Sequence, residues 1–125
     1  MRDILTTNFP ELVELYINGT LTIDFRPVFS RISQGRKCYL YASSPVQAVM
    51  AEAIIEDVVK VTAENRNDAN ITKLLSTDMD VKFLDSHLSV GKGYLVKFKD
   101  IKAYDKPITI GSLSLSRAPM SWCYV

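Results

Sequence analysis

The sequence predicts an α+β fold: a small, partly open, mainly antiparallel β-barrel with flanking helices. Most predicted strands follow one another directly along the chain, which favours antiparallel pairing. The helical patterns are confined to one segment near the N-terminus and one insert after the midpoint. A chain of 125 residues is enough for one ordinary domain, so residues 1–125 are expected to form a single domain.

The first part of the chain is expected to form a strand, a helix and a second strand. Residues 4–7, ILTT, are β-branched and predict a short strand. Asn8 is placed to cap a helix over 9–18, and Gly19 is placed to end it. Polar and apolar residues then alternate over 20–26, which predicts the second strand.

The middle of the chain contains one clear strand and one ambiguous segment. Residues 38–43, CYLYAS, are almost continuously apolar and predict a buried strand. In residues 46–63 the Ala, Met and Glu content favours a helix, whereas the many β-branched residues favour a strand. We predict a long strand, bent near Asp57, because the preceding strand needs a partner and the Ser-Ser-Pro sequence between them fits a turn.

The second half is expected to contain a helical insert followed by three strands. Thr77 and Asp80 have the spacing of a capping box at the start of a helix that ends at Gly91. Residues 93–105 alternate and predict a long strand. Two short closing strands are expected, at 106–110 and 121–125.

Composition and charge exclude several classes of function. The net charge of +1 gives no overall field that would attract a polyanion, so any binding to one must be local. Two isolated cysteines, Cys38 and Cys123, make no disulfide framework, and one histidine without a Cys-x-x-Cys pair predicts no metal site. We expect no cofactor. No signal peptide or membrane-spanning run is evident, so we expect a reduced, cytoplasmic protein without a membrane partner.

The order of these features resembles the ASCH domains of the PUA-like superfamily, in particular short archaeal-type members. The resemblance covers nearly the whole chain: TLTIDFR after a helix that ends in Gly, then YLYASSPVQAVMAEA, then GKGYLVKFKDIKAYDKPI, and finally APMSWCYV. The family motif is Gly-x-Lys-x-x-Glu-x-Arg. Gly19 and Arg26 match it, Asp24 replaces the Glu, and Leu21 replaces the Lys.

The resemblance implies a β-barrel whose cleft, partly lined by this motif, binds RNA or a modified nucleobase. It also implies that a few relatives are hydrolases, including an amidohydrolase of acylated cytidine that uses Lys, Thr and Glu. Here Leu21 stands at the Lys position and Asp24 at the Thr position. A leucine side chain cannot replace a catalytic amine, which argues against this amidohydrolase chemistry. We therefore expect a binding module rather than an enzyme.

Several residues are candidates for the site. Asp24 and Arg26 share one strand face, where they would either contact a ligand or form an ion pair with each other. Some further residues carry hydroxyl groups near a strand end, and others supply a cation or an aromatic ring. Such groups can contact phosphates or bases. The alternative is that they belong to turns or to the core. These further candidates are Tyr41, Ser43, Ser44, Lys92, Tyr94 and Trp122. For His87 we expect no catalytic role, because no nucleophile is linked to it.

Three hypotheses follow for function and partners. The main one is a module that binds RNA or a nucleotide-like ligand. The second is a hydrolase of RNA or a modified nucleoside, with Asp24 or Glu52 as general base. The third is a ligand-sensing module that works with a separate transcription regulator. Exposed terminal strands would also allow a homodimer.

Overall fold

The computed structural model, which describes residues 2–125, contains one six-stranded sheet with the strand order β2-β5-β4-β3-β1-β6. The strands are β1 (Ile4–Asn8), β2 (Ile23–Arg26), β3 (Lys37–Ala42), β4 (Ala48–Val61), β5 (Gly93–Ile108) and β6 (Trp122–Tyr124). β1 and β3 run parallel and the other neighbours run antiparallel. The predicted α+β, mainly antiparallel class is thus confirmed.

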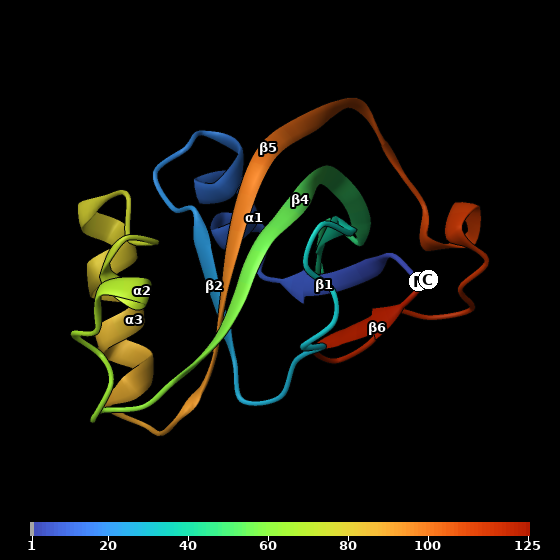
Figure 1. Cartoon of the computed structure of the whole chain (residues 1–125). Coiled ribbons are helices and arrows are strands. Elements are labelled where there is room, and N and C mark those ends of the chain that lie inside the picture. Colours follow the sequence, from blue (N-terminus) through green and yellow to red (C-terminus); the bar gives the residue numbers. More distant parts are fainter. Residues whose placement is uncertain (1) are drawn as a thin grey trace.

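One helix packs on the face of the sheet and the others lie toward its two ends. They are α1 (Pro10–Ile17), α2 (Ala69–Thr72), α3 (Asp78–Leu88) and the short 3-10 helix η1 (Ile110–Leu113). Figure 1 shows α2 and α3 together on one side of the molecule, beyond β2, and η1 on the other side near β6. Within residues 2–125, no helix is both long and apolar enough to cross a membrane.

β4 and β5 form a long, arched pair that gives the sheet its half-barrel shape (Figure 1). The pairing shifts register at three places, one of them between Ile55 and Asp57, where the sequence predicts a bend. The separate strand predicted at 106–110 is wrong. β5 instead continues to Ile108, which pairs with Val49, because the register shifts let β5 follow the curve of β4.

The main core lies between the sheet and the helices. Tyr16 of α1 packs edge-on against Phe98 of β5, with ring centroids 5.2 Å apart. A smaller cluster of Leu5, Tyr41 and Val49 packs against η1 and the C-terminal segment. Neighbouring strand residues point to opposite faces, so β1 contributes Ile4 to the main core and Leu5 to the smaller one.

The start of α1 differs from the sequence prediction. Asn8 is the last residue of β1, and Phe9 is the N-cap, without a side-chain capping bond. Pro10 begins the helix, where its missing N–H costs nothing. The Asn8 side chain is therefore available for other contacts. The predicted end is confirmed, since Gly19 follows the last turn with a φ of +80°.

Polar contacts fasten the start of α3 to the sheet. The predicted capping box of Thr77 and Asp80 is present. The buried Asp80 carboxylate also accepts hydrogen bonds from the Thr22 N–H (2.7 Å) and hydroxyl (2.6 Å). The Lys97 ammonium donates to the same Thr22 hydroxyl at 2.7 Å and to the Ser76 hydroxyl at 2.6 Å. We call these residues, Thr22, Ser76, Thr77, Asp80 and Lys97, the α3 anchor.

β5 begins in close contact with the end of β2. A Cβ atom on Gly93 would lie 2.7 Å from the Arg26 carbonyl oxygen and 2.7 Å from the Phe25 ring. A larger residue at position 93 would therefore push these groups apart. The glycine lets β5 hold Phe25 and Arg26 in place.

Candidate functional site

A cleft of about 390 Å³ lies where the end of β1, the start of α1, β2 and α3 meet. Its polar lining residues are Thr7, Asn8, Asp24, Arg26, Ser43 and His87. Its apolar lining residues are Phe9, Leu12, Phe25, Phe83 and Met120. The cleft thus combines polar groups from the strand ends with aromatic rings from the helices and β2.

Arg26 connects three segments of the chain beneath the cleft. Its Nε donates to Asp24 Oδ2 at 2.9 Å. Its Nη1 donates to the carbonyl and hydroxyl oxygens of Ser121, and its Nη2 donates to Thr7 O and Asn8 Oδ1. An arginine has five N–H donors, so the guanidinium is engaged in every direction. Arg26 offers a ligand mainly its charge and its planar face.

The charged state of Arg26 is secured by its neighbour. Burial works to lower the pKa of Arg26, but the Asp24 carboxylate outweighs it and raises the pKa. Asp24 Oδ1 accepts a hydrogen bond from the Phe25 N–H at 2.8 Å, and Oδ2 accepts from Arg26. Each carboxylate oxygen can accept a second bond, so Asp24 can still receive a donor from a ligand.

Asn8 presents a hydrogen-bond donor at the cleft. Its Oδ1 accepts from Arg26 Nη2 at 2.8 Å, and this bond fixes the orientation of the side-chain amide. Its Nδ2 is buried and has no hydrogen-bond partner among residues 2–125. A buried donor without a partner is costly, and a ligand that accepts its hydrogen bond removes that cost.

Aromatic rings form the walls. His87 and Phe83 of α3 lie with ring centroids 4.2 Å apart, and His87 lies 5.3 Å from Phe25. His87 Nδ1 is 2.8 Å from the Phe83 carbonyl oxygen. A carbonyl can only accept, so Nδ1 carries the proton and Nε2 is the acceptor in the neutral ring. At the lip, Phe9 is 73% exposed and Met120 is 100% exposed.

Among the residues that the structure describes, no acidic or thiol cluster has the arrangement of a metal site. Within the described range 2–125, no group of three or more His, Cys, Asp or Glu side chains is placed to hold a metal ion. Cys38 is buried, and burial raises the pKa of its thiol to about 12. This thiol is therefore neutral and unreactive in the folded chain.

Solved structures of an ASCH protein from Zymomonas mobilis share this architecture. A Tyr-to-Phe variant gives a TM-score of 0.74 at 18% identity, covering 100% of this chain and 91% of the other. A Ser-to-Ala variant gives 0.72 at 18%, covering 99% and 88%, and a structure described simply as ASCH gives 0.73 at 19%, covering 99% and 87%. The chain has the ASCH fold.

The sequence comparisons add nothing to this likeness: no family model matches the chain, and no curated protein matches it. The resemblance to ASCH domains predicted from the sequence is thus confirmed at the level of the fold. The archaeal-type detail stays a prediction.

The ASCH motif residues fall in two environments. Asp24 and Arg26 lie at the cleft, where they form the ion pair that the sequence left as an alternative to ligand contact. Leu21, at the position of the motif lysine, is completely buried in the main core. The cleft therefore receives no amine from this position.

The structure brings some of the other candidates to the cleft. Ser43 lines it, and its N–H donates to the Asn8 carbonyl at 2.9 Å. Lys92 lines an adjoining hollow. Ser44 lies in the turn between β3 and β4, joined to Pro45 by a cis peptide bond.

The remaining aromatic candidates lie in packed positions away from the cleft lining. Tyr41 belongs to the smaller core cluster. The Arg31 guanidinium carbon lies over the Tyr94 ring, 6.0 Å from the centroid of that ring. Trp122 packs against Phe29 with ring centroids 5.2 Å apart, and its Nε1 donates to the Val28 carbonyl at 2.8 Å. This arrangement agrees with the core alternative for Trp122.

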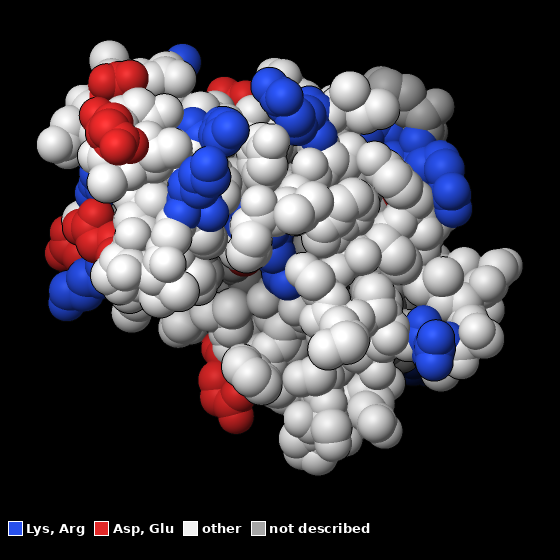
Figure 2. All heavy atoms as spheres, turned by 90° about the horizontal axis from the view of Figure 1, so that it is seen from below, with Lys and Arg blue, Asp and Glu red and all other residues white. Residues whose placement is uncertain are grey.

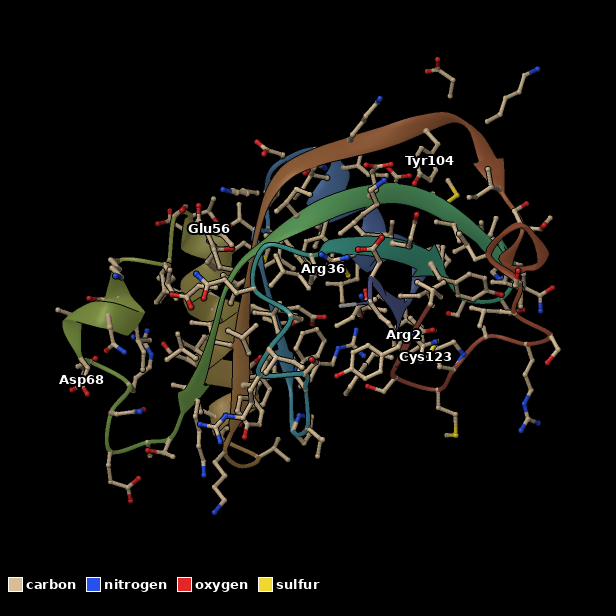
Figure 3. All side chains as sticks on the ribbon, turned by 45° about the vertical axis from the view of Figure 1, so that its right-hand side comes forward. Arg2, Arg36, Glu56, Asp68, Tyr104 and Cys123 are labelled. Carbon is tan, nitrogen blue, oxygen red and sulfur yellow. The ribbon has the colours of Figure 1, made fainter. Side chains whose placement is uncertain are left out.

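Glu52 lies on the arched pair of strands. It accepts a hydrogen bond from the Tyr104 hydroxyl at 2.9 Å and lies 3.5 Å from the Lys37 ammonium. Figure 3 shows Tyr104 on the arch of β5, away from α3. The α3 residues Phe83 and His87 line the cleft. Glu52 is therefore not placed to act together with Asp24.

Sequence reasoning proposed Asp24, Arg26 and Ser43 as site residues but not the other residues that line the cleft. Asn8 was interpreted as a helix cap, and His87 was considered for catalysis and set aside because no nucleophile is linked to it in the sequence. Phe9 and Phe83 gave no signal beyond being apolar. Pro10 was expected in the first turn of the helix; taking it as the first helical residue makes Phe9 the N-cap and places Asn8 in the strand.

Proposed function

We propose that this protein binds RNA, or a nucleotide-like ligand, by taking one unpaired nucleobase into the cleft. One observation carries the proposal. The cleft contains both an unsatisfied hydrogen-bond donor and a hydrogen-bond acceptor, and aromatic rings lie on either side of them. Asn8 Nδ2 is the donor and the Asp24 carboxylate is the acceptor. The edge of a nucleobase carries both kinds of partner, and its faces stack on aromatic rings.

The size of the cleft fits this ligand. Its volume of about 390 Å³ falls within the range of small-molecule sites, which begins at about 300 Å³. Phe9 at the lip supplies an exposed ring for stacking, and the Ser43 hydroxyl supplies a further polar contact. A flat ring with a polar edge satisfies both parts of this lining.

The surface charge favours local recognition over binding along a backbone. The net charge is +1, and on the face drawn in Figure 2 the Lys and Arg side chains form several groups with uncharged residues between the groups. Proteins that follow a nucleic-acid strand by charge use a continuous basic groove. We therefore expect base contacts in the cleft to contribute most of the affinity.

Hydrolysis is the weaker alternative. Both oxygens of Asp24 already accept hydrogen bonds, from the Phe25 N–H and from Arg26 Nε, so the carboxylate is held as a structural ion pair rather than directed at a water molecule. Glu52 lies outside the cleft lining. The hypothesis of a sensor that works with a transcription regulator stays a prediction, and so does the homodimer.

Fluorescence anisotropy of labelled single-stranded RNAs tests the proposal. Phe9→Ala removes an exposed ring at the lip, so we expect it to weaken binding by about 5- to 70-fold, the loss expected for one base stack of about 1–2.5 kcal/mol. Ile32→Ala is the matched control. Ile32 is also largely exposed, at 70%, but it does not line the cleft.

Two outcomes would overturn the proposal. The first is no binding by the unmodified protein at low salt. The second is an equal affinity of the Phe9→Ala and Ile32→Ala variants for RNA. Cleavage of the RNA during the same assay, abolished by Asp24→Asn, would favour the hydrolase alternative.

A further inference from the structure

A second hollow of about 340 Å³ adjoins the cleft. It is lined by Phe25, Pro27, His87, Val90, Gly91 and Lys92. Phe25 and His87 also line the cleft, so these two rings form the boundary between the two spaces. The cleft and this second hollow are therefore two parts of one groove.

The boundary between them is a fixed aromatic edge. The His87 and Phe25 rings lie 5.3 Å apart at an interplanar angle of 43°. The bond between His87 Nδ1 and the Phe83 carbonyl prevents rotation of the imidazole, and the close packing on Phe83 supports it. Phe25 is held in turn by its close approach to Gly93. Two successive bases of a strand can therefore lie on opposite sides of the Phe25 and His87 rings, one in each hollow.

The second hollow also carries a positive charge. Lys92 is exposed in the turn before β5, and within residues 2–125 its ammonium forms no ion pair at 4.0 Å or less. Lys92 interacts electrostatically with Glu64, although weakly. The pKa of Glu64 is lowered chiefly by the Thr62 side chain, and Lys92 makes only a smaller contribution to the shift. The Lys92 ammonium is thus free to approach a phosphate.

We propose that the groove binds two successive nucleotides of a single strand. One base lies in the cleft against Asn8 and Asp24, the next sugar and base lie in the second hollow, and the phosphodiester contacts Lys92. The two hollows differ in character, because the first holds the hydrogen-bonding groups and the second is mainly apolar. The first position therefore selects the base, and the second adds affinity with little selectivity. This proposal rests on the proposed function of the cleft.

Calorimetric titration with ribonucleosides and with the corresponding dinucleotides ApA, CpC, GpG and UpU tests the proposal. For the base that binds best, we expect the dinucleotide to bind at least about tenfold more tightly than the nucleoside, because it fills both hollows. Lys92→Gln should remove most of this gain while leaving nucleoside affinity unchanged. The matched control is Lys106→Gln, which removes an exposed lysine near the far end of β5.

A second variant tests the hollow independently of Lys92. Val90 is 90% exposed, so Val90→Asp leaves the fold intact and places a negative charge at the rim of the second hollow. We expect it to weaken dinucleotide binding, again without changing nucleoside binding.

The outcomes separate the two proposals. Equal affinities for nucleoside and dinucleotide, or equal effects of Lys92→Gln and Lys106→Gln, overturn the second position and leave the cleft proposal standing. If neither nucleoside nor dinucleotide binds, both proposals fail.

Discussion

Arg26 explains how a single side chain organises the candidate site. It joins β2 to the end of β1 and to Ser121, just before β6, so the cleft floor is formed by segments that are far apart in sequence. Its ion pair with Asp24 is almost completely buried. Breaking a buried pair by removing one partner leaves an uncompensated charge, which is far more costly than losing a surface ion pair.

Arg26→Met should therefore lower the free energy of unfolding by about 3–5 kcal/mol. The control is Arg66→Met, which removes a pair with the largely exposed Asp85 and should cost less than about 1 kcal/mol. Urea denaturation measures both values. Similar losses for the two variants would show that Arg26 has no special structural role.

Asn8 allows recognition to be separated from folding. In Asn8→Asp, a carboxylate oxygen still accepts from Arg26 Nη2, but the unpaired Nδ2 donor is replaced by an acceptor. We expect stability to change by less than about 1 kcal/mol, while affinity for the nucleobase falls about tenfold or more, since a hydrogen bond is exchanged for a repulsion. Anisotropy and thermal denaturation of the same sample check both parts. Unchanged affinity would rule out a contact through Asn8.

At the level of elements, the α3 anchor determines where two walls of the cleft lie. α3 carries Phe83 and His87, and its first turn is tied to β2 and β5 through Asp80 and Lys97. Burial lowers the pKa of Lys97, and the nearby Asp80 carboxylate acts against that shift. Helix propensity alone would not fix the position of this helix, so these contacts are needed to align its rings with the cleft.

Asp80→Asn should weaken this attachment. The substituted amide turns one oxygen acceptor into a donor that faces the N–H groups of Ser76 and Thr77, and it removes the carboxylate charge that contributes most to raising the pKa of Lys97 against burial. We expect a loss of about 3 kcal/mol in unfolding free energy. Asp78→Asn, at an exposed position in the same first turn, should cost at most about 1 kcal/mol. Equal losses would mean that Asp80 acts only through the helix dipole.

At the level of the whole molecule, local signals predicted the elements and long-range contacts determined the site. The capping box at Thr77 follows from neighbouring residues, and the strand over 46–63 was predicted because local composition was combined with the need of the preceding strand for a partner. The parallel pairing of β1 with β3 joins segments separated by a helix and a strand, and no local pattern specifies it. The Asn8 side chain was misinterpreted for the same reason, because its partner is 18 positions away.

The buried thiol of Cys38 predicts how the stability of the whole molecule depends on pH. Its pKa is about 12 in the folded chain and near 9 when unfolded, so between these values the folded state binds more protons. The free energy of unfolding should therefore fall as pH rises above 9, by up to about 1.4 kcal/mol per pH unit from this group. Urea titrations at pH 8.5 and 10 should show a smaller decrease for Cys38→Ala. If the unfolding free energy falls by the same amount in the unmodified protein and in Cys38→Ala, the thiol is not held neutral by burial.

The central claim is that the cleft between β1, α1, β2 and α3 receives a nucleobase, and an NMR titration of the ¹⁵N-labelled protein with ribonucleosides tests it most directly. The account predicts saturable shifts of the Asn8 side-chain amide together with the backbone signals of Phe25, Phe83 and His87, whereas signals from the arch of β4 and β5 stay in place. Shifts confined to other surfaces, or no shifts at millimolar nucleoside, would contradict it.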